Sequence, residues 1–407
     1  MSLLKSSLSS VNSIQRTAGL SGLLSSIVYP KAKTTPGLEV NPTTSMKISG
    51  FFCGVKNITD AIAMLPFRVY QKEGKSKELQ DSHNIDEIIY SAPNRKMVAF
   101  QFWKAMATAI IIKGNAYAQI IRDGAGRVRE LNFIHPEDVQ VYEYEGELYY
   151  KVKGQRSMLF DYEIFHVPGF SWNGITGIGV IKYAADNLGL SLAADEFGTE
   201  SFANKGVTYG AVETDKSLND IGKRNIRSLV AGDLQADTLH RVAVLDEGMK
   251  YKPIGITPQE AQFIESKAQG VEDIARWLNI PLHKLHAKGE GGYNFLVQMD
   301  IEYMKSTIMP LVVPILQEIM KKLMDPQERS LGYYVHADYN YLLKADPKSR
   351  AQYYKDLVMV KAMSPNEVRE LEEMNPYEGG DEYLQMVNMI TDEQYKKKLE
   401  NESNTAQ

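Results

Sequence analysis

The amino-acid sequence predicts a protein of the α+β class, in which β-hairpins and long helices occupy different stretches of the chain. Residues 116–133 form two strand-like runs on either side of an Asp-Gly turn, the strongest short signal for a β-hairpin. Residues 178–204, 258–278 and 294–324 instead repeat apolar side chains at helical spacing. The chain has 407 residues, 43% hydrophobic and 24% charged, and this length is enough for about two or three domains with separate cores.

Composition argues against several classes of protein. The formal net charge of −5 lacks the basic excess of a conventional groove-reading nucleic-acid binder. The single cysteine, Cys53, cannot form an internal disulfide, and its setting in "SGFFCGV" favours a small buried side chain over a nucleophile. The N-terminus has no signal-peptide core, and the longest apolar run, residues 308–316, contains two prolines and is too short to cross a bilayer. We therefore expect a soluble chain made in a reducing, intracellular compartment, without membrane contact.

The N-terminal half is predicted, in order, as an arm, a helix, a strand and a second helix. Residues 1–44 are rich in Ser, Thr, Gly and Pro, which indicates a flexible arm. Residues 45–65 repeat apolar side chains every three or four positions and stop at Pro66, as a helix does. The stretch "PFRVYQKEGKSKEL" then predicts a strand, a Gly turn and a charged edge, and residues 99–112 are apolar enough for a core helix.

The Gly-x-Gly of residues 124–126 could be a phosphate cradle or a tight turn. A dinucleotide-binding loop needs a third glycine and a helix after it, whereas here Arg129 stands at that position and a strand-like run follows. The sequence therefore predicts a hairpin turn over residues 123–126. The "GKS" of residues 74–76 fails as a P-loop, because Val69 stands where the first glycine is required. No nucleotide-binding loop is predicted.

Candidate catalytic and metal-binding residues are few. The chain has no G-x-S-x-G, H-E-x-x-H or Cys-x-x-Cys motif, and its carboxylates are scattered along helix faces. His135 and His166 each follow an apolar strand, where a structural role is the simpler interpretation. His283 and His286 could ligate a metal ion, but no Asp, Glu or Cys lies at a supporting spacing, so a flexible loop is favoured. We expect no catalytic residue, no metal and no cofactor, and therefore not an enzyme.

Two of the three long helices carry clear end signals. Residues 178–204 are followed by Gly206, a good C-terminal stop. The second helix has Thr257 as N-cap, Pro258 as its first residue and Glu260 completing a capping box. It presents apolar side chains on one face before it halts at a proline. These long helices, and the unusual loop that follows the second, stand out in the sequence.

The third long helix, residues 294–324, follows the Gly-rich loop "HKLHAKGEGGYN". Pro310 and Pro314 lie inside its apolar stripe, and each removes a backbone donor and clashes with the preceding turn. We therefore expect a kink at these prolines. The stripe fits either the core of a large domain or a contact between neighbours in a ring, and spacing alone does not decide between them.

Several blocks of sequence occur together in a recognisable order. They are "NITDAIAMLPFRVY", "APNRKMVAFQFWKAMATAIIIKGNAYAQIIRDGAGRVRELNFIHPEDVQV", "EIFHVPGFSWNGITGIG", "IARWLNIPLHKL" and "SPNEVRELEEMNPYEGGDEY". With them, roughly residues 45–385 resemble the portal proteins of siphovirus-type, long-tailed bacteriophages, the head-to-tail connectors of these phages. The chain departs from the family at Gly179 and Val180, where such portals often carry Ser-Pro before the stem helix. The tail after Asp381 is short and polar, so an extended helical crown is not expected.

The resemblance implies a mixed α/β wing, a two-helix stem, a small α/β clip and a long channel helix with a proline kink. Such subunits assemble into a ring, usually of twelve, around double-stranded DNA at one capsid vertex. The expected parts, in chain order, are an N-terminal arm (1–44), the N-terminal part of the wing (45–177), a stem helix (178–205), a clip (206–256), a second stem helix (257–281), a tunnel loop (282–294), a channel helix (295–325), the C-terminal part of the wing with a short crown (326–385) and a polar tail (386–407).

The resemblance also implies a site and partners. The tunnel loop would face the DNA with His283, Lys284, His286, Lys288, Glu290, Tyr293 and Asn294. Lys284 and Lys288 would touch phosphates transiently, without reading bases, or would simply be solvated loop charges. The implied partners are other copies of the chain, sequence-nonspecific DNA, the terminase large subunit, the major capsid protein and scaffold, and a head–tail connector protein. The implied location is the virion, with assembly in the host cytoplasm.

Two other classes of protein stay open. A different head–tail adaptor ring would share the virion location, although such proteins are generally much shorter. A metal-dependent enzyme that processes nucleic acids would need clustered carboxylates, which the sequence does not display. The mildly acidic composition fits a conduit, because strong phosphate neutralisation would hold DNA rather than let it pass.

Overall fold

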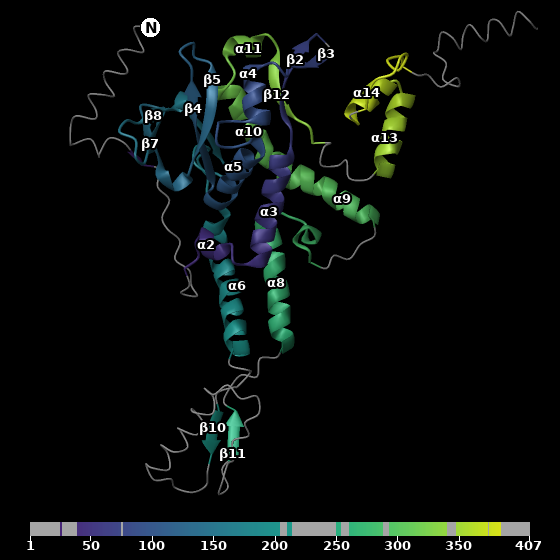
Figure 1. The fold of residues 1–407 in the computed structure, drawn as a ribbon. Coiled ribbons are helices and arrows are strands. Elements are labelled where there is room, and N and C mark those ends of the chain that lie inside the picture. Colours follow the sequence, from purple (N-terminus) through teal and green to yellow (C-terminus); the bar gives the residue numbers. More distant parts are fainter. Residues whose placement is uncertain are drawn as a thin grey trace, which may run out of the picture.

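The computed structural model has the mixed helical and stranded composition that the sequence predicts (Figure 1). A body of helices and sheets sits above two long helices that lie side by side. The described residues are 25–26, 39–74, 76–203, 210–213, 250–253, 260–287, 293–339, 347–372 and 374–383. The predicted arm (1–44) therefore lies largely, and the predicted polar tail (386–407) wholly, outside the described residues.

The helix predicted over residues 45–65 is α3 (Ser49–Met64), which begins four residues later than predicted, and a short helix, α2 (Pro42–Ser45), precedes it. Between them Ile48 is extended, with φ −74° and ψ 112°, so the helix is interrupted there. α3 ends close to the predicted position, because Leu65 precedes a proline and adopts the extended conformation that a following proline favours. The apolar repeat within α3 is buried in the body.

The described part of the body contains three antiparallel sheets. Their strand orders are β12-β2-β3, β5-β4-β9 and β1-β6-β7-β8. The strands are β1 (Ser25–Ser26), β2 (Phe67–Glu73), β3 (Ser76–Leu79), β4 (Asn115–Arg122), β5 (Val128–Ile134), β6 (Val139–Tyr144), β7 (Glu147–Val152), β8 (Leu159–Phe160), β9 (Ile164–Pro168) and β12 (Tyr333–Ala337). Short helical segments join them: α4 (Asn84–Asp86), a π-helical turn (Glu87–Ser91) and 3₁₀ turns at Pro136–Asp138 and Asp161–Glu163.

The Gly-x-Gly stretch is a hairpin turn, as predicted. β4 and β5 pair antiparallel from Tyr117 opposite Ile134 to Arg122 opposite Val128. The Asp123 carboxylate closes the turn, because its Oδ1 accepts hydrogen bonds of 2.9 Å from the N–H groups of Ala125 and Arg127. A strand, not a helix, follows the glycines, so the turn lacks the helix N-terminus that a phosphate cradle requires.

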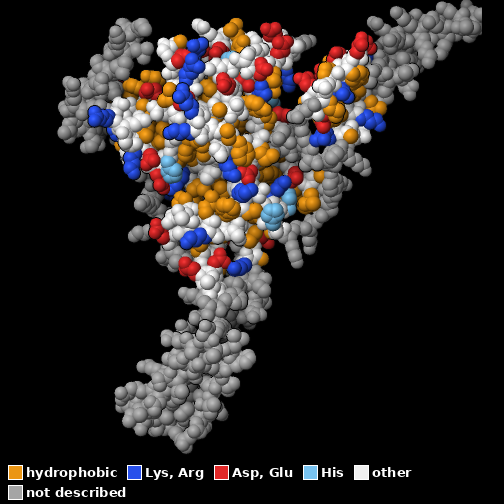
Figure 2. Space-filling view, in the orientation of Figure 1, with side chains coloured by type: hydrophobic (Ala, Val, Ile, Leu, Met, Phe, Trp, Pro, Cys, Tyr) orange, Lys and Arg blue, Asp and Glu red, His pale blue; other side chains and the backbone are white. Residues whose placement is uncertain are grey.

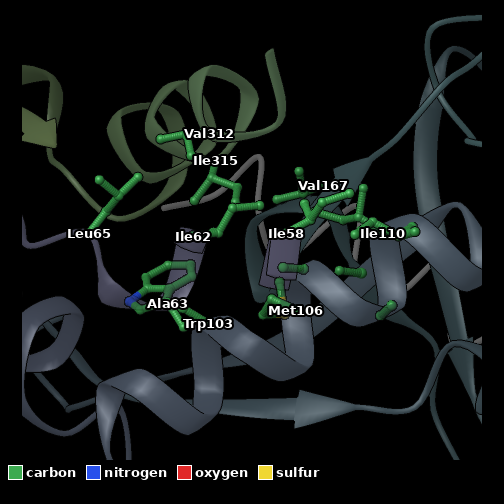
Figure 3. Packing of buried hydrophobic residues seen from close by; sticks show 14 of the residues in the cluster. Ile58, Ile62, Ala63, Leu65, Trp103, Met106, Ile110, Val167, Val312 and Ile315 are labelled. Carbon is green, nitrogen blue, oxygen red and sulfur yellow. The ribbon is translucent and has the colours of Figure 1, made fainter. Parts of the chain in front are cut away.

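The core lies between α3, α5 (Ala99–Lys113) and α10 (Met309–Lys322). α5 matches the predicted core helix and packs on α3 and on the β5-β4-β9 sheet. Trp103 on α5 is 1% exposed, its ring lies 4.8 Å from that of Phe67, and its Nε1 donates a 2.8 Å hydrogen bond to the Ile89 carbonyl. Figure 3 shows its ring near Ile62 of α3, with Ile315 of α10 beside them. The three helices therefore share one apolar core.

A polar network inside the body joins side chains of β4 and β9. The buried His166 ring stacks on Tyr117 with centroids 4.4 Å apart, and its Nε2 lies 3.1 Å from Asn115 Oδ1. That oxygen accepts the Gly177 N–H, so it also accepts from His166, whose Nε2 therefore carries a proton. Burial, aided by the positive charge of Lys322, lowers the pKa of His166 to about 3. The predicted structural role of His166 is confirmed.

We expect the neutral His166 to make stability depend on pH. In the unfolded chain His166 titrates at its ordinary value of about 6.5, whereas in the fold its pKa is about 3. Between these values the unfolded state binds the additional proton, so the free energy of unfolding should rise with pH by about 1.4 kcal/mol per unit. Urea denaturation from pH 4 to 7 measures this slope. His166→Gln should flatten this slope, and His135→Gln should leave it unchanged. A His166→Gln protein with the same slope as the wild type would contradict the expectation.

His135, the control residue, is exposed at the start of a 3₁₀ turn. Its Nδ1 accepts the Glu137 N–H at 3.4 Å and so caps the turn Pro136–Asp138. This is the structural role predicted for a histidine at a strand end. Because His135 is exposed, it does not belong to a buried polar network like the one around His166.

The two long helices below the body are α6 (Val180–Ala203) and α8 (Glu260–Leu278). They run antiparallel: Asn187 Nδ2 donates to Asp273 Oδ2 at 2.9 Å near the body, and Asp195 pairs with Lys267 at 2.8 Å further away. Beyond them lie the paired strands β10 (Gly210–Glu213) and β11 (Lys250–Pro253) (Figure 1). Both helices match their predicted spans to within two residues. The capping box predicted around Thr257 and Pro258 lies outside the described residues.

The third predicted helix, residues 294–324, is divided into α9 (Tyr293–Tyr303), a π-helical turn (Met304–Ile308) and α10. Figure 1 shows that α9 and α10 point in different directions. The chain continues through α11 (Pro326–Ser330) and β12 to a pair of helices beside the body, α13 (Pro347–Met359) and α14 (Pro365–Leu371).

Candidate functional site

The first residues of the predicted tunnel loop form a packed turn. Residues Leu282–Leu285 make one turn of 3₁₀ helix directly after α8. Leu285 is buried against α3, where Gly54 leaves room for it: a Cβ added at Gly54 would lie 3.2 Å from Leu285 Cδ2. Asn57 on α3 donates a 2.8 Å hydrogen bond to the Lys284 carbonyl. The flexible loop expected around His283 is therefore not observed at this position.

Two of the predicted site residues, His283 and Lys284, meet on one carboxylate of α9. His283 Nε2 lies 2.9 Å and Lys284 Nζ 2.8 Å from Asp300 Oδ1. Burial alone would raise the pKa of Asp300, but the hydrogen bonds and charges of these two side chains outweigh it and lower the pKa. The ammonium group of Lys284 also lies 5.7 Å from the Tyr303 ring centroid. The positive charge of Lys284 is thus already paired within its own subunit.

The other predicted loop residues are not brought to this carboxylate. His286 is exposed, and its backbone is in the left-handed conformation, with φ 55°, at the end of the 3₁₀ turn. Lys288 and Glu290 lie outside the described residues, as do the side chains of Tyr293 and Asn294, whose backbone begins α9.

Within the part of the chain that the structure describes, no group of three or more His, Cys, Asp or Glu residues could hold a metal ion. The described helices include none that is both long and apolar enough to cross a bilayer.

The bend between α9 and α10 lies next to this turn, just before the position predicted from the prolines. The five-residue π turn precedes Pro310, which lies in the first turn of α10, while Pro314 lies inside α10. In a regular helix the N–H of residue 310 would bond the Ser306 carbonyl, and proline has no N–H to give. Asn279, directly after α8, donates its Nδ2 to that carbonyl at 2.9 Å. The residue that follows α8 therefore supplies the hydrogen bond that Pro310 removes.

Asn279 is fixed by its backbone as well as by its side chain. Its φ of 51° is in the left-handed region, where Asn is tolerated better than most residues. Its carbonyl accepts a hydrogen bond from the Thr307 hydroxyl of the π turn. Sequence reasoning missed Asn279 and Asp300. An Asn directly after the last apolar residue of a helix is a known stop signal, but nothing in the local pattern marks Asp300.

Replacing Asn279 should lower the free energy of unfolding, and two different substitutions separate the effect of its side-chain hydrogen bond from that of its left-handed backbone. Asn279→Gly keeps the left-handed backbone and loses the exposed hydrogen bond to Ser306, so we expect a loss of about 0.5–1.5 kcal/mol in the free energy of unfolding. Asn279→Ala adds backbone strain and should cost about 1 kcal/mol more. Chemical denaturation of both variants measures the difference. Equal stability of the glycine variant and the wild type would show that Asn279 does not hold the bend.

Solved structures with the same architecture define the class of fold. The chain matches an HK97-family phage portal protein from Corynebacterium diphtheriae with a TM-score of 0.58 and 16% identity, over 76% of this chain and 98% of that chain. It matches a chain in the neck of an empty gene transfer agent particle with a TM-score of 0.57 and 20% identity, over 86% of this chain and 98% of that chain. The fold is therefore the portal fold.

Sequence comparison leads to the same family. The family model for phage portal proteins matches residues 49–373, and the chain belongs to this family. It is 25% identical to the portal protein of Enterobacteria phage HK97 in an alignment over 371 residues that covers 86% of this chain and 84% of that protein. It is 24% identical to the probable portal protein of Streptomyces phage phiC31 over 375 residues, 86% of this chain and 79% of that protein. The resemblance seen in the sequence blocks is confirmed.

Proposed function

We propose that the chain forms a ring at one capsid vertex and that double-stranded DNA passes through this ring during packaging and ejection. The observation that carries the proposal is membership of the portal family over residues 49–373. A related fold occurs in the neck of a native gene transfer agent particle whose structure was computed with C12 symmetry, with a TM-score of 0.54. Twelve subunits are therefore the proposed number. The ring would assemble in the host cytoplasm and remain in the virion.

The parts of the fold receive their proposed roles from this arrangement. The body would be the wing, and α6 and α8 would be the stem. Residues 206–256, to which β10 and β11 belong, would be the clip that meets the terminase large subunit and later a head–tail connector protein. Scaffold and major capsid protein would contact the outer face of the ring. The chain would perform no catalysis of its own, and a test for divalent-metal-dependent cleavage of DNA would check this.

The proposed DNA site is the loop of residues 282–294, which would face the channel. Lys284 is only 29% exposed and shares Asp300 with His283, so a phosphate would have to compete with that carboxylate. Such competition weakens the attraction to phosphate, which suits DNA that must slide. Lys288 would make a second transient contact without base readout. The bent helix after the loop, with Pro310 and Pro314, would line the channel.

Electron microscopy of the purified protein, combined with its mass in solution, tests the ring. Closed rings with a central hole of duplex width are the expected result. A compact dimer that forms no ring under any condition, scaffold and capsid protein included, would overturn the proposal.

The DNA site is tested separately by Asp300→Asn, which should release Lys284. Rings of this variant should bind a random-sequence duplex more tightly, and the salt dependence of binding should steepen by about 0.9 for each additional phosphate contact. Asp195→Asn is the matched control, because it removes the same charge from an ion pair with Lys267 on the helix pair. Equal effects of the two variants would mean that overall charge, not Lys284, governs DNA binding.

A further inference from the structure

Residues 347–383 form a small unit at the side of the body, which we call the C-terminal module. It consists of α13, α14 and the turns after α14, and Figure 1 shows it standing beside the body. The buried Asn366 holds it together: its Nδ2 donates to the Tyr377 carbonyl at 3.0 Å and to Asp381 Oδ1 at 2.9 Å. Glu372 joins the two helices through Arg350, at 3.1 Å, and the Tyr354 hydroxyl, at 2.8 Å. The module thus has a defined shape of its own.

One end of this module combines exposed acidic and aromatic side chains. Tyr377 is 51% and Tyr383 53% exposed, and the same stretch of chain carries the exposed carboxylates Glu370, Glu378, Asp381 and Glu382. Its one cation, Arg369, lies with its guanidinium 5.7 Å from the Tyr377 ring centroid. Figure 2 shows the red acidic side chains gathered at the outer end of the module. Amphipathic tyrosines beside carboxylates suit a partner surface that is basic and partly apolar. We call this surface the acidic end.

A basic cavity of about 440 Å³ lies in the body between α4, the β4–β5 turn, the end of α10 and α11. Its cationic lining residues are Arg122, Arg127, Lys321, Lys322 and Arg329, against three carboxylates, Asp161, Asp325 and Glu328. Figure 2 shows blue side chains over the neighbouring β4–β5 hairpin.

The positive charge of this cavity is only partly neutralised by its own residues. Lys322 is paired with Asp161 at 2.8 Å and with Glu318 at 3.0 Å, and Arg127 is paired with Asp123 of the β4–β5 turn at 3.1 Å. Arg122 donates to the carbonyls of Gly126 and Lys322, at 3.0 and 2.7 Å, which leaves its charge uncompensated. Lys321 and Arg329 have no carboxylate partner among the described residues. An acidic ligand would therefore find several unpaired cations here.

The acidic end and the basic cavity lie at the same end of the subunit, opposite β10 and β11, but on different sides of the body (Figure 1). A closed ring needs contacts of this head-to-tail kind, in which two different surfaces of each subunit meet. We infer that the acidic end of one subunit docks in the basic cavity of the next. This inference rests on the proposed ring. The tyrosines would bury apolar area and the opposite charges would set the register.

Cysteine cross-linking tests which subunit the module contacts. In a Cys53→Ser background, Arg329→Cys places a thiol in the cavity and Glu382→Cys places one at the acidic end. Mild oxidation of this double variant should give a ladder of covalent oligomers that extends to the full ring on a non-reducing gel. Lys153→Cys with Glu382→Cys is the control, because Lys153 is exposed and lies outside the cavity.

A ladder from the cavity pair, and none from the control pair, is the expected result. Cross-links confined to single chains would overturn the inference, because the module would then dock on its own subunit. Rings seen by microscopy without cross-links would also overturn it, while the proposed function would stand. If neither rings nor ladders form in any condition, both fall.

A charge swap provides a second measurement. Arg329→Glu or Glu382→Arg alone should raise the subunit concentration at half assembly by about tenfold, equivalent to about 1.4 kcal/mol. The double variant should recover most of that loss. If the double variant assembles no better than the worse single variant, the two residues do not face each other.

Discussion

Gly177→Ala should prevent the chain from folding or lower its free energy of unfolding by roughly 4 kcal/mol or more, at the upper limit of single substitutions. A Cβ built on Gly177 would overlap the Gly114 carbonyl oxygen and would lie 2.6 Å from the Gly169 N. Both neighbours are backbone atoms, so no side-chain rotation can relieve the overlap. The two chain segments would have to move apart.

That separation would break hydrogen bonds that hold the segments together. Asn115 brackets Gly177: its Nδ2 donates to the Gly177 carbonyl at 2.8 Å, and its Oδ1 accepts the Gly177 N–H at 2.7 Å. The Gly169 N–H donates to the Gly114 carbonyl at 2.7 Å. Gly114 itself is left-handed, with φ 84°, so its own replacement would be strained even without the overlap.

Thermal unfolding followed by circular dichroism measures the effect. Gly124→Ala is the matched control, because a Cβ at Gly124 meets no atom within 4 Å and its φ is not in the left-handed region. We expect the control to unfold within a few degrees of the wild type. A Gly177→Ala protein that unfolds at the wild-type temperature would show that the two segments can separate without loss of the fold.

The contact between Gly177 and the segment Gly114–Asn115 also shows what could and could not be predicted from the sequence. Gly114, Asn115 and Gly177 all lie in blocks that carry the family resemblance, and the hairpin after Asn115 was predicted with its turn. What no local pattern indicates is that Asn115 contacts Gly177, 62 positions away in the sequence. Hydrophobic periodicity reports which face of an element is buried, and it says nothing about the distant segment that covers that face.

In the bent helix, too, the local sequence predicts the feature but not the tertiary contact that positions it. Pro310 and Pro314 predicted a kink, because a missing N–H is a local property of the sequence. The bend lies in the π turn before Pro310, where Asn279, the residue after α8, contacts the turn, and this tertiary contact determines its position. Lys284 was likewise expected either to touch DNA phosphates transiently or to be a solvated loop charge, and its ion pair with a carboxylate was not predicted. Its partner Asp300 lies beyond the Gly-rich stretch, so only the fold brings them together.

Lys322→Met should cost about 3–5 kcal/mol in the free energy of unfolding, the range for removing one partner of a buried ion pair. Only 4% of the Lys322 side chain is exposed, and its Nζ lies 2.8 Å from Asp161 Oδ1 and 3.0 Å from Glu318 Oε1. It also donates to the Ile164 carbonyl at 2.7 Å. Methionine fills a similar volume, so the loss would come from the carboxylates and carbonyl left without a donor.

Two further variants separate this cause from lost packing. Lys305→Met makes the same chemical change at an exposed position and should alter the free energy of unfolding by less than about 0.5 kcal/mol. Adding Glu318→Gln to Lys322→Met removes one of the stranded charges, so the double variant should be more stable than Lys322→Met alone. If the double variant is instead less stable, the stranded charge of Glu318 is not what destabilises Lys322→Met.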